Sequence, residues 1–206
     1  YSYISRQAIR YDITNQMGVN NTKLALDGSV IQFAPQATIE EYPEIDLFGY
    51  MKTDKKNTKT RSAVVRLSNA VSLEPYNGDM DFLTNKGLLD RYNKQENEST
   101  KDGGNIAQSE IHKSYYAYTI TIDLDQVGID ENDDINLPNS EKAKRINNLL
   151  DTVKMLYRDI KGRREDLKPI FSIGGVYDIK NPFFEGKLSV SNNKLNINTI
   201  KDILEL

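Results

Sequence analysis

Residues 114–129 read SYYAYTITIDLDQVGI. The apolar or aromatic residues in this stretch alternate with small or polar ones, at Tyr116, Tyr118, Ile120, Ile122 and Leu124. A period of two is typical of a β-strand that buries one of its faces. We therefore predict one long strand here, with its apolar face against the core.

Downstream, the pattern changes to helical spacing. Between Ser140, a possible N-cap, and Gly162, a possible stop, the apolar side chains fall on one helical face: Ile146, Leu149, Leu150, Val153, Leu156, Tyr157 and Ile160. Residues 167–178 (LKPIFSIGGVYD) predict a buried strand. Residues 186–206 predict a turn or short strand followed by a last helix.

Upstream, residues 5–16 predict a helix with Ser5 as its N-cap, because Ile9 and Ile13 are four positions apart. Residues 43–51 form a short apolar segment, 52–60 a polar loop with four lysines, and 61–75 a strand. Residues 77–109 are polar and predict a long irregular insertion. Strands and helices alternate without a repeated βαβ period, so we expect an α+β or ferredoxin-like fold.

Composition narrows the function classes. With 206 residues, 38% of them hydrophobic, the chain can bury one core, and we expect one domain with insertions. It has no cysteine, which excludes disulfides and thiolate metal sites and fits a reducing, cytoplasmic setting. No apolar run approaches the roughly 20 residues of a membrane-spanning helix. Because the chain begins at Tyr1 within a structured-looking segment, we expect its natural N-terminus to lie upstream.

The charge is unevenly distributed. The net charge of −3 does not favour a general nucleic-acid binder. Acidic residues gather in 40–46 and 123–134, however, and basic residues gather in 52–66 and 161–168. We therefore expect a polarised surface.

Catalytic and metal motifs are not evident. His112 is the only histidine, so we interpret it as an ordinary surface or edge residue. The spacing of the aspartates in 123–134 does not match an EF-hand loop, and we interpret them as a solvated strand end. Gly174-Gly175 matches no phosphate-binding motif. We expect no cofactor, no metal and no catalysis.

Three groups of basic residues could hold phosphates. The first lies at a helix start, where free backbone N–H groups favour an anion: Ser5, Arg6, Gln7 and Arg10. The second lies in the polar loop and the strand after it: Lys52, Lys55, Lys56, Lys59, Arg61 and Arg66. The third is Lys161, Arg163 and Arg164. Each group also has an ordinary explanation, namely a capped helix with solvated arginines, a solvated loop, and cations at a helix C-terminus.

Aromatic residues add a second signal. The chain has 12 tyrosines and no tryptophan, and tyrosine rings can stack on unpaired bases. Tyr1, Tyr3 and Tyr11 flank the first basic group. Half-buried structural positions would explain any one of them equally well.

Five segments in order resemble the DevR-type CRISPR-associated autoregulator family, the backbone subunit of type I-B Cascade. They are YSYISRQAIRYDI (1–13), DLFGYM (46–51), RSAVVRLSNAVSLEPYNGDMDF (61–82), YYAYTITIDLDQVG (115–128) and GRREDLKPIFSIGGVYDIKNPFFEG (162–186). The resemblance implies one palm domain over 1–206, like an RNA-recognition motif, with insertions near 50–62 and 77–109. It also implies a first palm strand before Tyr1.

The resemblance further implies a function. Copies of such a subunit assemble head to tail along one CRISPR RNA, with other Cascade subunits and a complementary target DNA strand as partners, and bind without cutting. The helix-start group would then grip guide phosphates, Lys52–Arg66 would line the same groove, and 77–109 would be a thumb-like or target-facing element. The role of Arg163 and Arg164 stays open, whereas we expect Lys161 to neutralise a helix end. The acidic residues of 123–134, Asp133 and Asp134 among them, could meet a neighbouring copy.

Two other functions remain open. One is a metal-independent endoribonuclease that processes CRISPR repeat RNA on a related fold, for which only His112 and a glycine pair are available. The other is an interaction protein that binds no nucleic acid.

Overall fold

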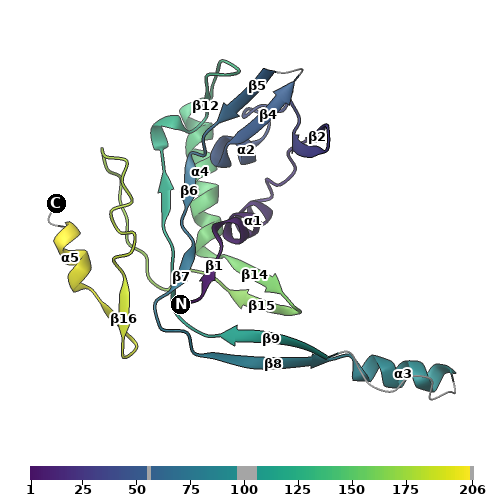
Figure 1. Cartoon of the computed structure of the whole chain (residues 1–206). Coiled ribbons are helices and arrows are strands. Elements are labelled where there is room, and N and C mark those ends of the chain that lie inside the picture. The colour runs from purple at the N-terminus through teal and green to yellow at the C-terminus, as the bar shows by residue number, and fades with distance from the viewer. Residues whose placement is uncertain (55–56, 97–105, 205–206) are drawn as a thin grey trace.

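The computed structural model describes residues 1–54, 57–96 and 106–204. A ribbon of antiparallel strands runs through the molecule, and helices α1 and α4 lie on one of its faces (Figure 1). The described helices are α1 (Arg6–Met17), α2 (Pro43–Phe48), α3 (Lys86–Glu96), α4 (Asn139–Lys154), α5 (Asn198–Leu204) and the 3-10 helix η1 (Leu124–Gln126). None of them is both long and apolar enough to cross a membrane. This mixture of helices and small antiparallel sheets confirms the α+β class.

Two segments distant in sequence pair along the central ribbon. The pairs are β6 (Val65–Leu67) with β11 (Ile120–Ile122), and β7 (Ala70–Ser72) with both β10 (Tyr116–Ala117) and β1 (Tyr3–Ile4). Leu67 lies opposite Ile120, and Val71 lies opposite Ala117. The chain therefore advances by four residues from Leu67 to Val71 but by only three between Ala117 and Ile120. The extra residue is a β-bulge, where the Thr119 N–H donates to Ser68 Oγ. The single strand expected for 61–75 is therefore two short strands.

The alternating pattern of residues 114–129 is confirmed at its centre. Tyr116, Tyr118, Ile120 and Ile122 pack against the core between the ribbon and the helices. The buried members of this core are Ile9, Ile13, Met17, Val19, Leu47, Phe48, Val65, Ala70, Leu149, Val153 and Leu156. The prediction was wrong at Leu124, which lies exposed in η1, and it missed the interruption at the bulge.

Helix α1 agrees with its prediction to within one residue. Ser5 is the N-cap, and its Oγ accepts a hydrogen bond from the Ala8 N–H at 3.2 Å. The helix ends at Gly18, which has a left-handed φ of 69°. A capping side chain at one end and a glycine at the other fix both ends of the helix.

Helix α4 was predicted with both ends wrong. Its N-cap is Pro138, not Ser140, and it ends at Lys154. The next residues form a hairpin, β14 (Tyr157–Ile160) and β15 (Arg163–Asp166), joined by two residues with positive φ, Lys161 at 49° and Gly162 at 75°. Such a turn suits a hairpin and not a helix. Lys161 therefore does not neutralise a helix end, because it lies at a hairpin tip.

A second hydrophobic core lies next to residues 50–54 and 57–61, which form a β-hairpin in place of the expected lysine loop. The strands of this part are β2 (Leu24–Asp27), β3 (Val30–Phe33), β4 (Tyr50–Asp54), β5 (Asn57–Arg61), β12 (Ile129–Asp130) and β13 (Ile135–Asn136). Its buried side chains are Ala34, Ala37, Ile39, Tyr42, Ile45 and Tyr50. The 52–60 segment was expected to be a loop because it contains no apolar residue. Instead, β4 and β5 pair from Tyr50 opposite Arg61 to Asp54 opposite Asn57.

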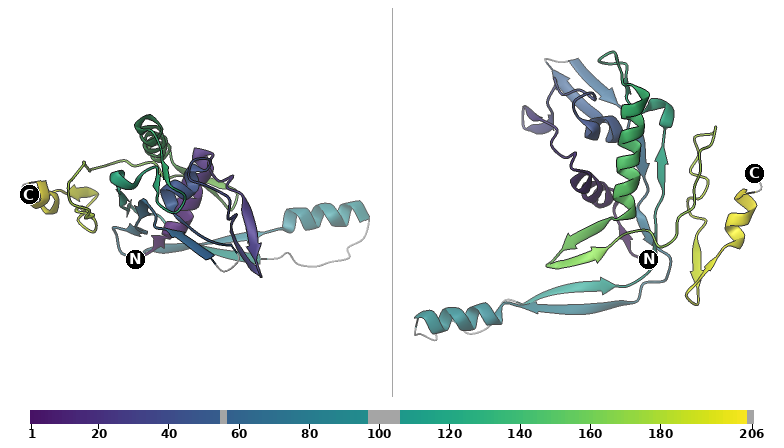
Figure 2. Two further views of the ribbon diagram at one scale, coloured as in Figure 1. Left: turned by 90° about the horizontal axis from the view of Figure 1, so that it is seen from above. Right: turned by 180° about the vertical axis from the view of Figure 1, so that it is seen from behind.

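Two parts extend from this body. Residues 77–109 were expected to be irregular, but they contain β8 (Gly78–Thr84) paired with β9 (Ile106–His112), and α3 follows β8 (Figure 2). No described residue of α3 is buried.

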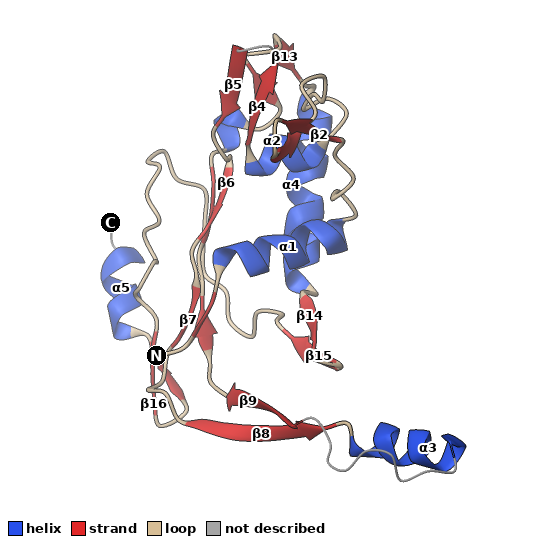
Figure 3. Ribbon diagram, turned by 45° about the vertical axis from the view of Figure 1, so that its right-hand side comes forward, coloured by secondary structure: helices blue, strands red, loops and turns tan. Residues whose placement is uncertain are grey.

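The C-terminal residues form the second extension. Residues 167–178 were expected to be a buried strand, but they form no strand, and Ile170 and Val176 are 78% and 83% exposed. Among the described strands, β10 pairs only with β7 and β11 only with β6, so each keeps an unpaired edge, and residues 167–178 pair with neither of them. The turn and last helix are confirmed by the hairpin of β16 (Ser189–Ser191) and β17 (Lys194–Asn196), which precedes α5 (Figure 3).

Candidate nucleic-acid interface

The start of α1 brings the first basic group together. Arg6 and Gln7 are exposed in the first turn. Two of the backbone donors there already have partners, because the Arg6 N–H donates to Asn69 Oδ1 at the bulge and the Ala8 N–H donates to Ser5. Ser5 therefore shapes the helix start, and the side chain of Arg6 is the main group left to meet an anion.

Exposed tyrosines flank this helix start in the sequence. Tyr1, Tyr3 and Tyr11 are 81%, 65% and 67% exposed. Tyr11 lies four residues after Gln7 and so on the same helix face. The Arg6 guanidinium has no carboxylate partner among the described residues. We call Tyr1, Tyr3, Arg6, Gln7 and Tyr11 the helix-start patch. It combines a free cation with flat rings.

Arg10 is less available than Arg6. Its guanidinium lies 4.9 Å from the centroid of the Phe48 ring and 4.0 Å from the Glu44 carboxylate. Burial lowers the pKa of Arg10, and Glu44 opposes that shift. A half-buried arginine in this position is mainly a packing residue of α1 against α2.

The lysines of the β4–β5 hairpin are tied to one carboxylate. Lys52 is only 2% exposed, and its Nζ donates to the Ala37 carbonyl at 2.6 Å and to Asp133 at 3.0 Å. Lys59 donates to the other oxygen of Asp133, and this hydrogen bond raises the pKa of Lys59. Burial acts to raise the pKa of Asp133, but the two lysines together hold it below its ordinary value.

The arginines after this hairpin are also paired. Arg61 donates from Nη2 to Asp46 Oδ1 at 2.8 Å, and Asp46 is fully buried. Arg66 pairs with Asp123 and points away from α1, since its neighbours Val65 and Leu67 face the core. Lys55 and Lys56 lie outside the described residues. The structure therefore does not join this second group to the helix start.

These pairs also correct part of the expectation of a solvated acidic strand end, which holds for the exposed Asp125 and Asp134. Asp123 and Asp130 are buried, and Asp130 accepts a hydrogen bond from the Tyr50 hydroxyl at 2.8 Å. Burial, followed by that hydrogen bond, raises the pKa of Tyr50. Asp123 and Asp130 are therefore engaged by residues of their own chain and not exposed toward a neighbouring copy.

The third basic group lies on the β14–β15 hairpin. Arg164 donates to Asp159 at 2.8 and 2.9 Å, and its guanidinium stacks 4.4 Å from the centroid of the Tyr157 ring. Arg163 is exposed, 3.9 Å from Glu165. This hairpin is joined to the C-terminal part of α1, because the Gln16 side chain donates to the Tyr157 carbonyl at 2.7 Å.

His112 belongs to a polar cluster that sequence reasoning missed. Its Nδ1 lies 2.5 Å from Ser2 Oγ, and Ser2 Oγ lies 2.7 Å from the Tyr116 hydroxyl. The segments involved are 110 residues apart, so no local spacing could reveal the cluster. Among the described residues, no three histidine, aspartate or glutamate side chains are grouped as a metal site.

Comparison with known proteins identifies the family. A family model described as CRISPR-associated negative auto-regulator DevR/Csa2 matches residues 1–185. The chain belongs to the DevR/Csa2 family. No curated protein sequence matches it. The DevR/Csa2 match confirms the family resemblance and establishes a CRISPR-associated protein. It includes the helix-start patch and the β14–β15 hairpin, and it ends before β16, β17 and α5.

Proposed function

We propose that this DevR/Csa2 protein is a non-catalytic subunit that binds CRISPR RNA in a type I-B Cascade complex. Copies of it assemble head to tail along the guide in the cytoplasm. Other Cascade subunits and the complementary target DNA strand are its further partners in this antiviral complex.

One observation carries the proposal: the guanidinium of Arg6 is exposed and has no carboxylate partner among the described residues, and exposed tyrosines lie close to it in the sequence. Most other described cations of the predicted site are neutralised by aspartates, namely Lys52, Lys59, Arg61, Arg66 and Arg164. We therefore place the main RNA contacts at the helix-start patch, with Arg163 as a further contact.

This chemistry suits a subunit that holds any guide sequence. A cation binds phosphate and a tyrosine ring stacks on any base, so neither depends on base identity. One subunit with few free cations binds weakly. A row of copies on one RNA adds the contacts and gives a high affinity with a steep salt dependence. Head-to-tail contacts use two different surfaces and so extend into an open filament.

The proposal is tested by binding of a labelled single-stranded RNA of about 30 nucleotides, measured by fluorescence anisotropy across salt concentrations. We expect Arg6→Ala to weaken binding about equally for unrelated sequences and to reduce the salt slope by about one contact per subunit. The control is Lys194→Ala, an exposed lysine of β17 that lies beyond the residues matched by the family model, which should leave binding unchanged. Unequal losses among sequences would indicate base reading, and no binding at low salt would favour an interaction protein.

A second candidate function is the repeat-processing endoribonuclease, and the Ser2–His112–Tyr116 cluster favours it. These three groups exchange hydrogen bonds, and a histidine near hydroxyls can transfer protons. Incubation of repeat RNA with the protein and a chelator distinguishes the two functions. Cleavage that is abolished by His112→Ala would replace the binding subunit with the nuclease.

A further inference from the structure

We propose that the hollow between α1, α4 and β14 receives one unpaired nucleobase, while the tip of the β14–β15 hairpin contacts the adjoining phosphates. The inference rests on the proposed RNA binding. It concerns a surface separate from the helix-start patch, so the two can fail independently.

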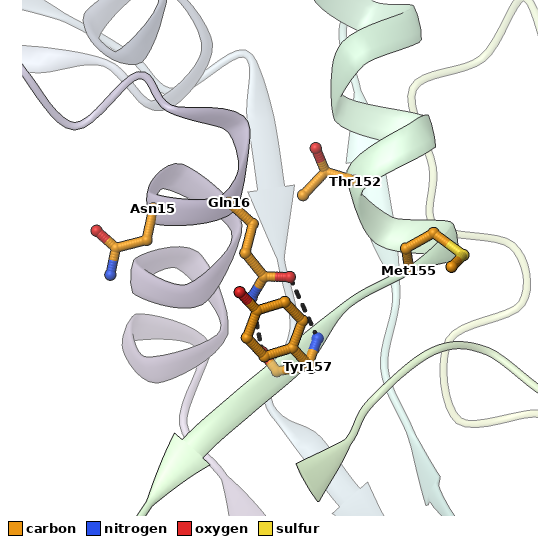
Figure 4. Close-up of a pocket in the computed structure, with 5 residues that line it drawn as sticks. All are labelled: Asn15, Gln16, Thr152, Met155 and Tyr157. Carbon is orange, nitrogen blue, oxygen red and sulfur yellow. Dashed lines mark hydrogen bonds between the residues drawn. The ribbon is translucent and has the colours of Figure 1, made fainter. Parts of the chain in front are cut away.

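The lining of the hollow suits a neutral planar ligand. The hollow measures about 430 Å³ and is lined by Asn15, Gln16, Thr152, Met155 and Tyr157 (Figure 4). These side chains supply two amides, a hydroxyl, a thioether and a phenol, and none of them is charged. An uncharged lining with aromatic and polar groups favours a heterocyclic ring over a free phosphate.

Two hydrogen bonds hold the wall of the hollow in place. Gln16 Nε2 donates to the Tyr157 carbonyl at 2.7 Å, and the Tyr157 N–H donates to Gln16 Oε1 at 3.3 Å. The Gln16 amide nitrogen keeps a second N–H, and the Thr152 hydroxyl has no partner among the described residues. Figure 4 shows Thr152 on α4 across from Gln16 on α1. Both groups can bond the polar edge of a base.

The Tyr157 ring can serve as a stacking surface. It is 37% exposed, and the Arg164 guanidinium stacked on it is fixed by two hydrogen bonds to Asp159. A ring held in this way loses little freedom when a base stacks on it. Stacking on an aromatic side chain tolerates every base.

Two cations lie at the turn of the β14–β15 hairpin, close enough to the hollow for one RNA strand to contact both places. Lys161 at the tip is exposed and has no partner among the described residues, and Arg163 follows the turn. β14 covers four residues and Lys161 follows it, so the tip lies about 13 Å from Tyr157 at the usual rise of about 3.3 Å per residue. A nucleotide with its base in the hollow can therefore direct its neighbour's phosphate toward these cations.

Because the chain has no tryptophan, one substitution gives a site-specific reporter. We expect the fluorescence of Tyr157→Trp to be quenched by a 30-nucleotide RNA but not by an abasic strand of the same length. Leu26→Trp on the exposed β2 is the matched control and should respond to neither. Equal quenching by both strands, or no quenching while labelled RNA still binds, overturns the nucleobase site and leaves the proposed function in place.

A second variant fills the hollow without removing a hairpin group. We expect Thr152→Phe to weaken RNA binding about fivefold or more, the usual loss for one stacked base, and to leave binding of the abasic strand unchanged. Wild-type affinity for RNA in this variant overturns the inference. If neither strand binds the wild-type protein, the proposed function fails and the nucleobase site fails with it.

Discussion

Asp46 is the residue at which three distant parts of the chain meet. Its carboxylate accepts hydrogen bonds from Arg61 at 2.8 Å, from Arg145 at 2.9 Å and from the Gly128 N–H at 3.0 Å. Arg145 is 99 positions away and lies on α4. Sequence reasoning treated 40–46 as surface acid, because a buried ion pair has no signature when its members are so far apart. The same limit explains why Lys52 and Arg61 were expected at an RNA surface.

Asp133 gives stability a dependence on pH. The pKa of this carboxylate is lowered in the folded protein, so its contribution is present at neutral pH and is lost as the pH falls below about 4. We expect Asp133→Asn to lower the free energy of unfolding by about 2 kcal/mol at pH 7, because the charge of Lys52 is left buried without its carboxylate partner. Urea denaturation at several pH values between 3 and 7 measures the difference, which should shrink toward pH 3.

The control for this prediction is Asp151→Asn. Asp151 pairs with Lys154 on the exposed surface of α4, and such pairs contribute under about 1 kcal/mol. Lys59 stays protonated across this range, since its pKa is raised, and so adds no slope. A constant difference between wild type and Asp133→Asn from pH 7 to pH 3 would contradict the role given to Asp133.

At the level of elements, the sequence predicted helix ends correctly where capping residues mark them, and wrongly where a turn interrupts the apolar spacing. Ser5 and Gly18 mark α1 in the sequence, and the helix ends within one residue of its prediction. The end of α4 was missed because Leu156, Tyr157 and Ile160 continue the helical spacing. The Lys161-Gly162 turn overrides that spacing, and Lys-Gly is a weaker hairpin signal than Asn-Gly.

The β14–β15 turn depends on the conformation of Gly162. Its φ of 75° is one that a residue with a Cβ seldom adopts, although open space surrounds it. We expect Gly162→Ala to destabilise the protein by about 1 kcal/mol, measured by urea denaturation. Gly174→Ala is the control, because Gly174 also faces open space and has no positive φ. Equal effects of the two variants would argue against the strained turn.

At the scale of the whole molecule, a packed body carries two exposed extensions (Figure 1). The fold keeps together the predicted residues that are contiguous in sequence, but only Arg6 and Gln7 of them are exposed, because Ser5 caps α1 and Arg10 packs against Phe48. The other predicted cations were divided among separate surfaces by the fold. Residues 167–178 have the apolar composition of a strand, but a strand also has to pair with a neighbouring strand, and among the described residues this segment pairs with none.

This architecture predicts the order in which trypsin cuts the chain. Cleavage needs a locally open backbone, so we expect the first cuts after Lys187 and Lys180 in the C-terminal extension and after Lys86, Arg91 and Lys94 around α3, where side chains are exposed. Lys52 and Arg145 are buried in ion pairs and should be protected until the body unfolds. Mass spectrometry of a time course under native conditions identifies the cuts. Early cleavage after Lys52 or Arg145, before any in the extensions, would show that the ion-paired body opens more readily than the parts it carries.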